Sequence, residues 1–228
     1  KEMLQDLLLF WSSKEGKNTT LAAYQDRMPE DQPYYYYACG ESVDKIAKLP
    51  QVERIMDKGY EILYCTEDVD DFVMKALGEV NGKQFKSVSD EDALPQTEEE
   101  KKAAEEKAEA GKDVLEAVKE ALGDQVKNVR VSSILKSGAC CLSADGPVSL
   151  EMEKYMSKLE GSDHPKADRV LELNPDSGAF AALRAALEGD KERARTYAEL
   201  LYDQALLIAR LPLEDPAAYT ELVCSLMQ

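Results

Sequence analysis

The run YYYYAC at residues 34–39 and the run YEILYC at residues 60–65 decide the fold of the first part of this chain. Both are rich in aromatic and aliphatic residues, which fit the pleated surface of a β-strand. Alternation sends Tyr34 and Tyr36 to one face of the first strand, and the tyrosine after each of them to the other face. We therefore predict two core strands rather than a surface on which nucleic-acid bases could stack.

Helix signals lie between and after these strands. Ser42 can cap a helix that stops before Pro50, and a second helix pattern ends at Gly59. A third helix is predicted at residues 68–77, followed by a short edge strand at residues 83–88. Strands that alternate with helices predict right-handed crossovers, so the fold class of this part is a small α/β layer.

A stretch without any large apolar residue divides the chain. Residues 98–112 (EEEKKAAEEKAEAGK) follow Pro95 and carry opposite charges at four-residue spacing. This pattern is typical of a solvated helix, and the alternative is a hinge between domains. We place one domain at residues 1–95, a linker or helical connection at residues 96–112, and a second domain at residues 113–228.

The second domain is predicted to be α+β. A helix at residues 114–122 precedes two strand runs, residues 126–132 and 139–143, which a short turn would join as a hairpin. A third strand is predicted at residues 169–173. Three helices follow, and the last two have the clearest periodicity.

Each of these last two helices carries one apolar stripe. Short helices bury such stripes poorly within one chain, whereas a two-fold pair would form a four-helix bundle. The alternative is a monomer in which both stripes pack on the preceding strands. We predict a homodimer through the stripe residues, which are Tyr197, Leu200, Leu201, Ile208, Tyr219, Leu222, Val223 and Leu226.

Charge and hydropathy exclude two kinds of partner. The 28 basic and 45 acidic side chains give a net charge of −17, which repels the phosphate backbone of nucleic acids. The apolar runs are far shorter than the roughly twenty residues that span a bilayer, so no membrane partner is expected. Five scattered cysteines without a Cys-x-x-Cys motif are typical of a reducing cytoplasm. The chain starts at Lys1 in a helical pattern, and we interpret it as a fragment of a cytoplasmic protein.

The usual signatures of catalysis and cofactor binding are missing from the sequence. The single histidine, His164, lies in a polar loop without a neighbouring nucleophile. Cys140 and Cys141 are consecutive on a predicted strand and point to opposite faces, so they cannot share one metal ion. There is no glycine-rich phosphate loop, and the acidic cluster at residues 67–71 is expected to cap the following helix. We predict no catalytic residue, metal ligand or cofactor in this chain.

Several collinear motifs resemble one family. LAAYQDRMPEDQPYYYYACGES at residues 21–42 and LPQVERIMDKGYEIL at residues 49–63 resemble the end of the middle domain of the heat shock protein 90 chaperones. The C-terminal domain of that family is similar to LGDQVKNVRV at residues 122–131, LELNPD at residues 171–176 and LYDQALLIARLPLEDP at residues 201–216. The bacterial HtpG type of the family is the most similar.

The resemblance implies a part of an ATP-dependent chaperone that dimerises and binds unfolded or partly folded client proteins. It implies that ATP and Mg²⁺ belong to a domain upstream of Lys1, so this chain is not expected to hydrolyse ATP. It also places one side of the client site at Phe72, the aromatic residue after the acidic pair Asp70-Asp71. The rival hypothesis is a stand-alone α/β enzyme domain fused to a helical dimerisation module.

A methionine-rich helix is the second candidate for client binding. Its apolar residues fall on one helical face between two polar loops, so we expect the helix to project from its domain with this face uncovered. Methionine is flexible and polarisable, which suits partners of many shapes, although spacing alone fits ordinary core packing as well. The resemblance implies that the matching helix contacts clients. The residues on this face are Val148, Met152, Tyr155, Met156 and Leu159.

Overall fold

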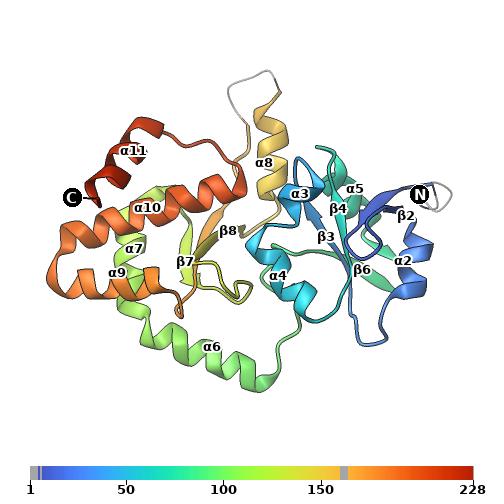
Figure 1. Cartoon of the computed structure of the whole chain (residues 1–228), viewed down its shortest axis with the longest axis horizontal. Helices are drawn as coiled ribbons and strands as arrows, with labels where there is room; N and C mark the ends of the chain where they lie inside the picture. Colours follow the sequence, from blue (N-terminus) through green and yellow to red (C-terminus); the bar gives the residue numbers. More distant parts are fainter. Residues whose placement is uncertain (1–4, 6, 160–163, 228) are drawn as a thin grey trace. The chain divides into compact units, whose positions relative to one another are not determined.

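A computed structural model describes residues 5, 7–159 and 164–227 of the 228-residue chain. It is a mixed α/β structure (Figure 1), which is the coarse fold class that the sequence predicts. The helical start expected near Met3 and most of the polar loop after Leu159 lie outside the described residues.

The chain divides into two compact units, each described here by itself. The first unit runs to Leu94 and takes in the described part of Glu151–His164. The second unit holds Pro95–Leu150 and the chain from Pro165 onward. A segment from the second half of the sequence is therefore part of the first unit.

A sheet of six strands, counted over the described residues, forms the centre of the first unit. Its strands are β1 (Phe10–Ser12), β2 (Asn18–Thr19), β3 (Tyr35–Cys39), β4 (Ile62–Cys65), β5 (Glu79–Val80) and β6 (Lys83–Ser87). Their order is β2-β1-β4-β3-β6-β5. β3 pairs in parallel with both β4 and β6, as expected of strands joined by helical crossovers. The outer pairs are antiparallel.

The prediction of an edge strand at residues 83–88 is wrong. β6 lies between β3 and β5, because the chain turns back at Asn81 and Gly82, both of which have positive φ. The strands β1 and β2 are also absent from the sequence prediction. Each is at most three residues long, too short for an alternating pattern to be recognised.

Helices cover both faces of this sheet. They are α2 (Leu21–Arg27), α3 (Val43–Ile46), α4 (Pro50–Asp57) and α5 (Asp70–Leu77). A further helix, α8 (Leu150–Ser157), contacts α5. Tyr36 points into an apolar cluster with residues of α3 and α4, whereas Tyr35 and Tyr37 point into a cluster with residues of α2 and α5. The predicted alternation of the tyrosines is therefore confirmed. Ser42 caps α3 by accepting from the backbone N–H of Lys45, as expected.

The second unit contains a small sheet and a helical layer. Its described strands are β7 (Asn128–Val131), β8 (Cys140–Ala144) and β9 (Arg169–Leu173), in the order β7-β9-β8. The predicted hairpin is wrong, because β9 lies between the two strands, parallel to β7 and antiparallel to β8. The buried carboxylate of Glu172 on β9 explains this order, since it accepts from Arg130 on one side and Ser143 on the other.

The helical layer packs on the apolar residues of this sheet. Its elements are α6 (Glu98–Ala110), α7 (Lys112–Leu122), η1 (Gly123–Gln125), α9 (Gly178–Gly189), α10 (Lys191–Ala209) and α11 (Pro216–Ser225). α7, α9 and α10 supply most of the helical core residues. α6 is a solvated helix, as its charge pattern predicts, and no side chain of α6 or α11 is buried.

Candidate functional site

The start of α5 positions Phe72. The preceding residue, Asp71, is buried and accepts a hydrogen bond of 2.9 Å from the hydroxyl of Tyr37, and it forms an ion pair of 3.3 Å with Lys75. Burial, and then the nearby carboxylate of Asp71, raises the pKa of Tyr37, so its hydroxyl stays a donor. With Asp71 directed into the unit, Phe72 is left half-buried beside it.

The acidic residues before Phe72 do not cap α5 through their side chains. The N-cap is Val69, which makes no side-chain hydrogen bond. The carboxylate of Asp70 instead accepts from the backbone N–H of Glu67 at 3.0 Å, and Asp68 forms an ion pair with Lys158. The predicted side-chain capping is wrong, because these carboxylates bond to the preceding turn, to Lys158 beyond α8 or to Tyr37 of β3. Asp70 and Asp71 nevertheless lie in the first turn of α5, where the positive end of the helix favours negative charge, as expected.

Three contacts hold α8 against α5 within the first unit. The rings of Phe72 and Tyr155 meet edge to face with centroids 5.3 Å apart. The Lys158 ammonium lies 2.6 Å from the Asp68 carboxylate, and the Lys75 ammonium lies 3.7 Å from the Met152 sulfur. The expectation of a projecting helix with an uncovered face is therefore wrong, because this face is partly covered by α5.

The structure brings most of the predicted client residues together. Phe72, Met152, Tyr155 and Met156 are all half-buried, and Leu159 is 50% exposed. We call these five residues, which lie on or beside α5 and α8, the aromatic-methionine surface.

Two residues near this surface differ from the sequence prediction. Val148 precedes α8 and packs against the core of the second unit, so it does not share a helical face with the methionines. Val69, which the prediction omits, is 47% exposed at the start of α5. The sequence carries no signal for this exposure.

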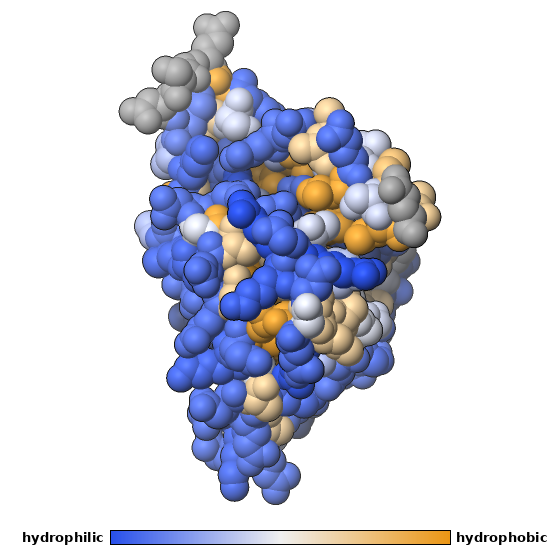
Figure 2. All heavy atoms as spheres, turned by 90° about the vertical axis from the view of Figure 1, so that its left-hand side faces the viewer, coloured by the Kyte–Doolittle hydropathy of each residue, from blue (hydrophilic) through white to orange (hydrophobic). Residues whose placement is uncertain are grey.

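The residues predicted for the dimer interface divide into two groups. Leu200 and Leu201 are only 4% and 6% exposed and already buried within the protomer, because they face the core side of α10. The other predicted residues remain at least partly exposed, and they are Tyr197, Ile208, Tyr219, Leu222, Val223 and Leu226. Leu207, which was not predicted, is 47% exposed. Figure 2 faces the side of the chain that bears these helices and shows apolar patches within a largely hydrophilic surface.

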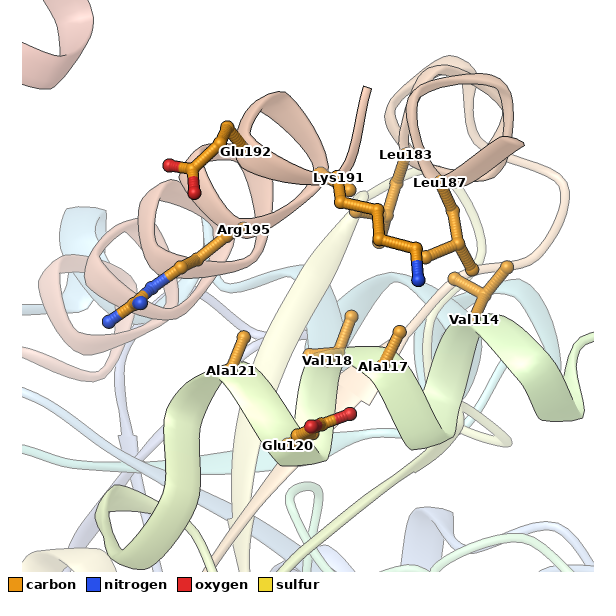
Figure 3. Close-up of a pocket in the computed structure, with 11 residues that line it drawn as sticks. Val114, Ala117, Val118, Glu120, Ala121, Leu183, Leu187, Lys191, Glu192 and Arg195 are labelled. Carbon is orange, nitrogen blue, oxygen red and sulfur yellow. The ribbon is translucent and has the colours of Figure 1, made fainter. Parts of the chain in front are cut away.

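A pocket of about 420 Å³ opens in the second unit between α7 and the pair α9 and α10 (Figure 3). Its floor is aliphatic, with Val118 of α7 and Leu183 and Leu187 of α9. Charged side chains such as Lys191 and Glu120 lie around it. Its lining includes no hydroxyl, thiol or imidazole group.

The described residues offer no ligand set for Mg²⁺ or for another metal ion. No group of three or more His, Cys, Asp or Glu side chains among them is close enough to hold one. Burial raises the pKa of Cys140 to about 11 and raises the pKa of Cys141 as well, so both remain protonated thiols.

Among the residues that the structure describes, no helix is long and apolar enough to cross a membrane.

The fold and the surfaces described above define a class: a mixed α/β protein of two units that carries partly exposed apolar surfaces on its helices. The family model for the Hsp90 protein matches residues 1–228, and the chain belongs to the Hsp90 family. The resemblance stated from the motifs is therefore confirmed.

Relatives of the HtpG type match over the whole chain. The chain is 50% identical over 227 residues to the chaperone protein HtpG of Bacillus subtilis (strain 168), 49% identical over 228 residues to that of Clostridium perfringens (strain ATCC 13124) and 46% identical over 228 residues to that of Clostridium botulinum (strain Langeland). Each match covers 100% of this chain and 36% of the relative. These relatives do not favour the rival hypothesis of a stand-alone enzyme domain.

Proposed function

We propose that this chain is the client-binding and dimerising part of an Hsp90 chaperone of the HtpG type. The observation that carries the proposal is the contact between Phe72 and Tyr155, which joins two separately predicted client sites into one surface. The relatives named chaperone protein HtpG support the general function. ATP and Mg²⁺ would be bound by a part of the full-length protein outside this chain, and the protein would act in the cytoplasm.

The chemistry of the aromatic-methionine surface suits an unfolded polypeptide. An aromatic pair offers ring faces and edges to apolar side chains, and two methionines adapt to clients of different shape. The contact between Phe72 and Tyr155, with the exposed ion pair between Lys158 and Asp68 beside it, sets α8 against α5 and leaves the surface partly exposed. The net charge of −17 keeps the rest of the chain hydrated and limits its own aggregation.

A client-aggregation assay tests this proposal. We expect Phe72→Ala and Met156→Ser, each in the whole chain, to weaken suppression of the aggregation of a denatured test protein. Loss of one aromatic pair corresponds to a fall in affinity of about two- to tenfold. The matched control is Met56→Ser, because Met56 is an exposed methionine on α4 of the same unit.

Circular dichroism separates loss of binding from loss of structure. Both variants should stay folded, with Met156→Ser close to the melting temperature of the unchanged chain and Phe72→Ala lower by no more than the loss of one aromatic pair, about 0.5–1.5 kcal/mol, since both side chains are only half-buried. Unchanged suppression by both variants, at an unchanged melting temperature, would contradict the assignment of this surface. Equal weakening by Met56→Ser would contradict it as well.

A further inference from the structure

Two cysteines lie side by side at the carboxyl ends of β3 and β4. Cys39 and Cys65 are directly opposite each other in the parallel register of these strands. Both side chains point to the same face of the sheet, since Cys65 belongs to the apolar cluster there and Cys39 packs against it. In the described part of the chain no other two cysteines face each other across paired strands.

The backbone geometry at this pair is compatible with a disulfide. Neighbouring strands lie about 4.7–4.9 Å apart, within the range of about 4.4–6.8 Å that disulfides bridge between Cα atoms. The backbone N–H of Gly40 donates to the carbonyl of Cys65 at 2.9 Å, so the strands are still paired one residue beyond Cys39. Bonding the two sulfurs would therefore need little movement of the backbone.

The two thiols differ in access to solvent. Cys65 is 1% exposed, whereas Cys39 is half-buried. Burial, and then the neighbouring Cys39 side chain, raises the pKa of Cys65, whose thiol donates to the backbone carbonyl of Leu63 at 3.9 Å. The sulfur that an oxidant can reach is that of Cys39, and the Cys65 side chain lies on the same face of the neighbouring strand.

We propose that Cys39 and Cys65 form a redox-active dithiol that closes to an intrachain disulfide with hydrogen peroxide as the oxidant. The Cys39 thiolate attacks one peroxide oxygen, the O–O bond breaks, and Cys39 becomes a sulfenic acid while hydroxide leaves and takes up a proton to become water. The sulfur of Cys65 then loses its proton and attacks the sulfenic sulfur, so that the S–S bond forms and a second water leaves. Two thiols are oxidised by two electrons in total, and one peroxide is reduced to two waters. This proposal does not depend on the proposed client site.

Peptide mapping of the intact chain after peroxide treatment tests the proposal. After alkylation of the remaining thiols and cleavage with trypsin, we expect residues 28–45 and 59–75 to appear as one linked species that a reductant separates. Of the five thiols of the unchanged chain, two should be lost and then regained on reduction. Cys39→Ser should abolish the linked species, and Cys224→Ser, at an exposed position on α11, should leave it intact.

Two results would overturn the assignment. One is sulfinic or sulfonic acid at Cys39 with no linked peptide. The other is a linkage that persists in Cys39→Ser, which would show that another cysteine is the partner of Cys65. Cys65→Ala is a second variant whose melting temperature shows whether the buried position tolerates the change, and it too should lose the linked species.

Discussion

Glu61 illustrates how one buried side chain depends on groups distant in sequence. Its carboxylate is 3% exposed and accepts hydrogen bonds from Arg27 at 2.7 Å and from the hydroxyl of Ser12 at 2.5 Å. The hydroxyl of Tyr24 donates to its backbone carbonyl at 2.6 Å. The residue therefore ties β1 and α2 to the segment that leads into β4. A buried charge is tolerated only when it is paired and hydrogen-bonded in this way.

We expect Arg27→Ala to destabilise the chain strongly. The change removes the cationic partner of Glu61 and leaves a buried carboxylate unpaired, which costs about 3–5 kcal/mol. Urea unfolding followed by circular dichroism would measure this loss. Lys45→Ala is the control, since Lys45 pairs with Glu41 at an exposed position, where an ion pair contributes about 0–1 kcal/mol. Similar small losses for both variants would show that Glu61 does not depend on its partner.

Local and distant partners differ in how well the sequence predicts them. The caps at Ser42 and Ser177 bond to a backbone N–H three residues later, so a short pattern is enough to predict them. Phe72 and Tyr155 are in contact although they lie 83 positions apart in the sequence (155 − 72), and no local pattern indicates this contact. The sequence predicts the chemical character of both client candidates, but their meeting requires the tertiary structure.

Whole helices and strands show the same difference between local features, which the sequence predicts, and distant contacts, which it does not. Periodicity predicts the existence of α5, α7, α10 and α11, because each helix carries its own apolar pattern. The order of strands is not local. Two nearby strand runs suggest a hairpin by default, yet β9 separates β7 from β8. The near-complete burial of β9 is what a central strand requires, and Val170, Leu171 and Leu173 fit that place, whereas Glu172 is tolerated there because Arg130 and Ser143 donate to its carboxylate.

We expect Thr97→Ala to loosen α6 alone. Thr97 and Glu100 form a capping box, in which each side chain accepts from the other residue's backbone N–H. Removing such a cap costs about 1 kcal/mol of helix stability, but α6 has no buried side chain through which to transmit the loss. Hydrogen exchange should become faster over residues 98–110 while the global unfolding midpoint stays the same.

A change elsewhere on α6 provides the comparison. Lys102→Ala replaces an exposed side chain outside the capping box, and it should leave the exchange rates of the first turn unchanged. A fall in the global midpoint with Thr97→Ala would show that α6 is coupled to the core of the second unit, contrary to its solvated character.

At the scale of the whole molecule, the division of the chain is only partly visible in the sequence. The boundary between the two units, after Leu94, falls beside Pro95, where the composition of the sequence changes. The inclusion of α8 in the first unit follows from side-chain contacts such as that between Lys158 and Asp68. Composition along the chain carries no record of such contacts, so a continuous second domain is the natural sequence prediction.

The C-terminal helix α11 carries apolar side chains that the rest of the protomer covers only in part. It spans ten residues, which is too short to be a stable isolated helix in water, and none of its side chains is buried. Tyr219, Leu222 and Val223 are half-buried, and Leu226 is 43% exposed. Each leucine would contribute about 1.5–3 kcal/mol on full burial. A second copy of α10 and α11 related by a two-fold axis would bury these side chains in a four-helix bundle.

We therefore expect the chain to sediment as a dimer, at twice the 25.4 kDa of one copy, at tens of micromolar. Leu222→Asp together with Leu226→Asp should give a folded monomer, because two carboxylates per copy would be buried without partners in the bundle. Ala217→Asp is the matched control, since it adds a carboxylate to an exposed position on the opposite side of α11 and should leave the dimer intact. A single-copy mass for the unchanged chain would refute the dimer, whereas a dimer that survives both aspartates would show that it forms through another surface.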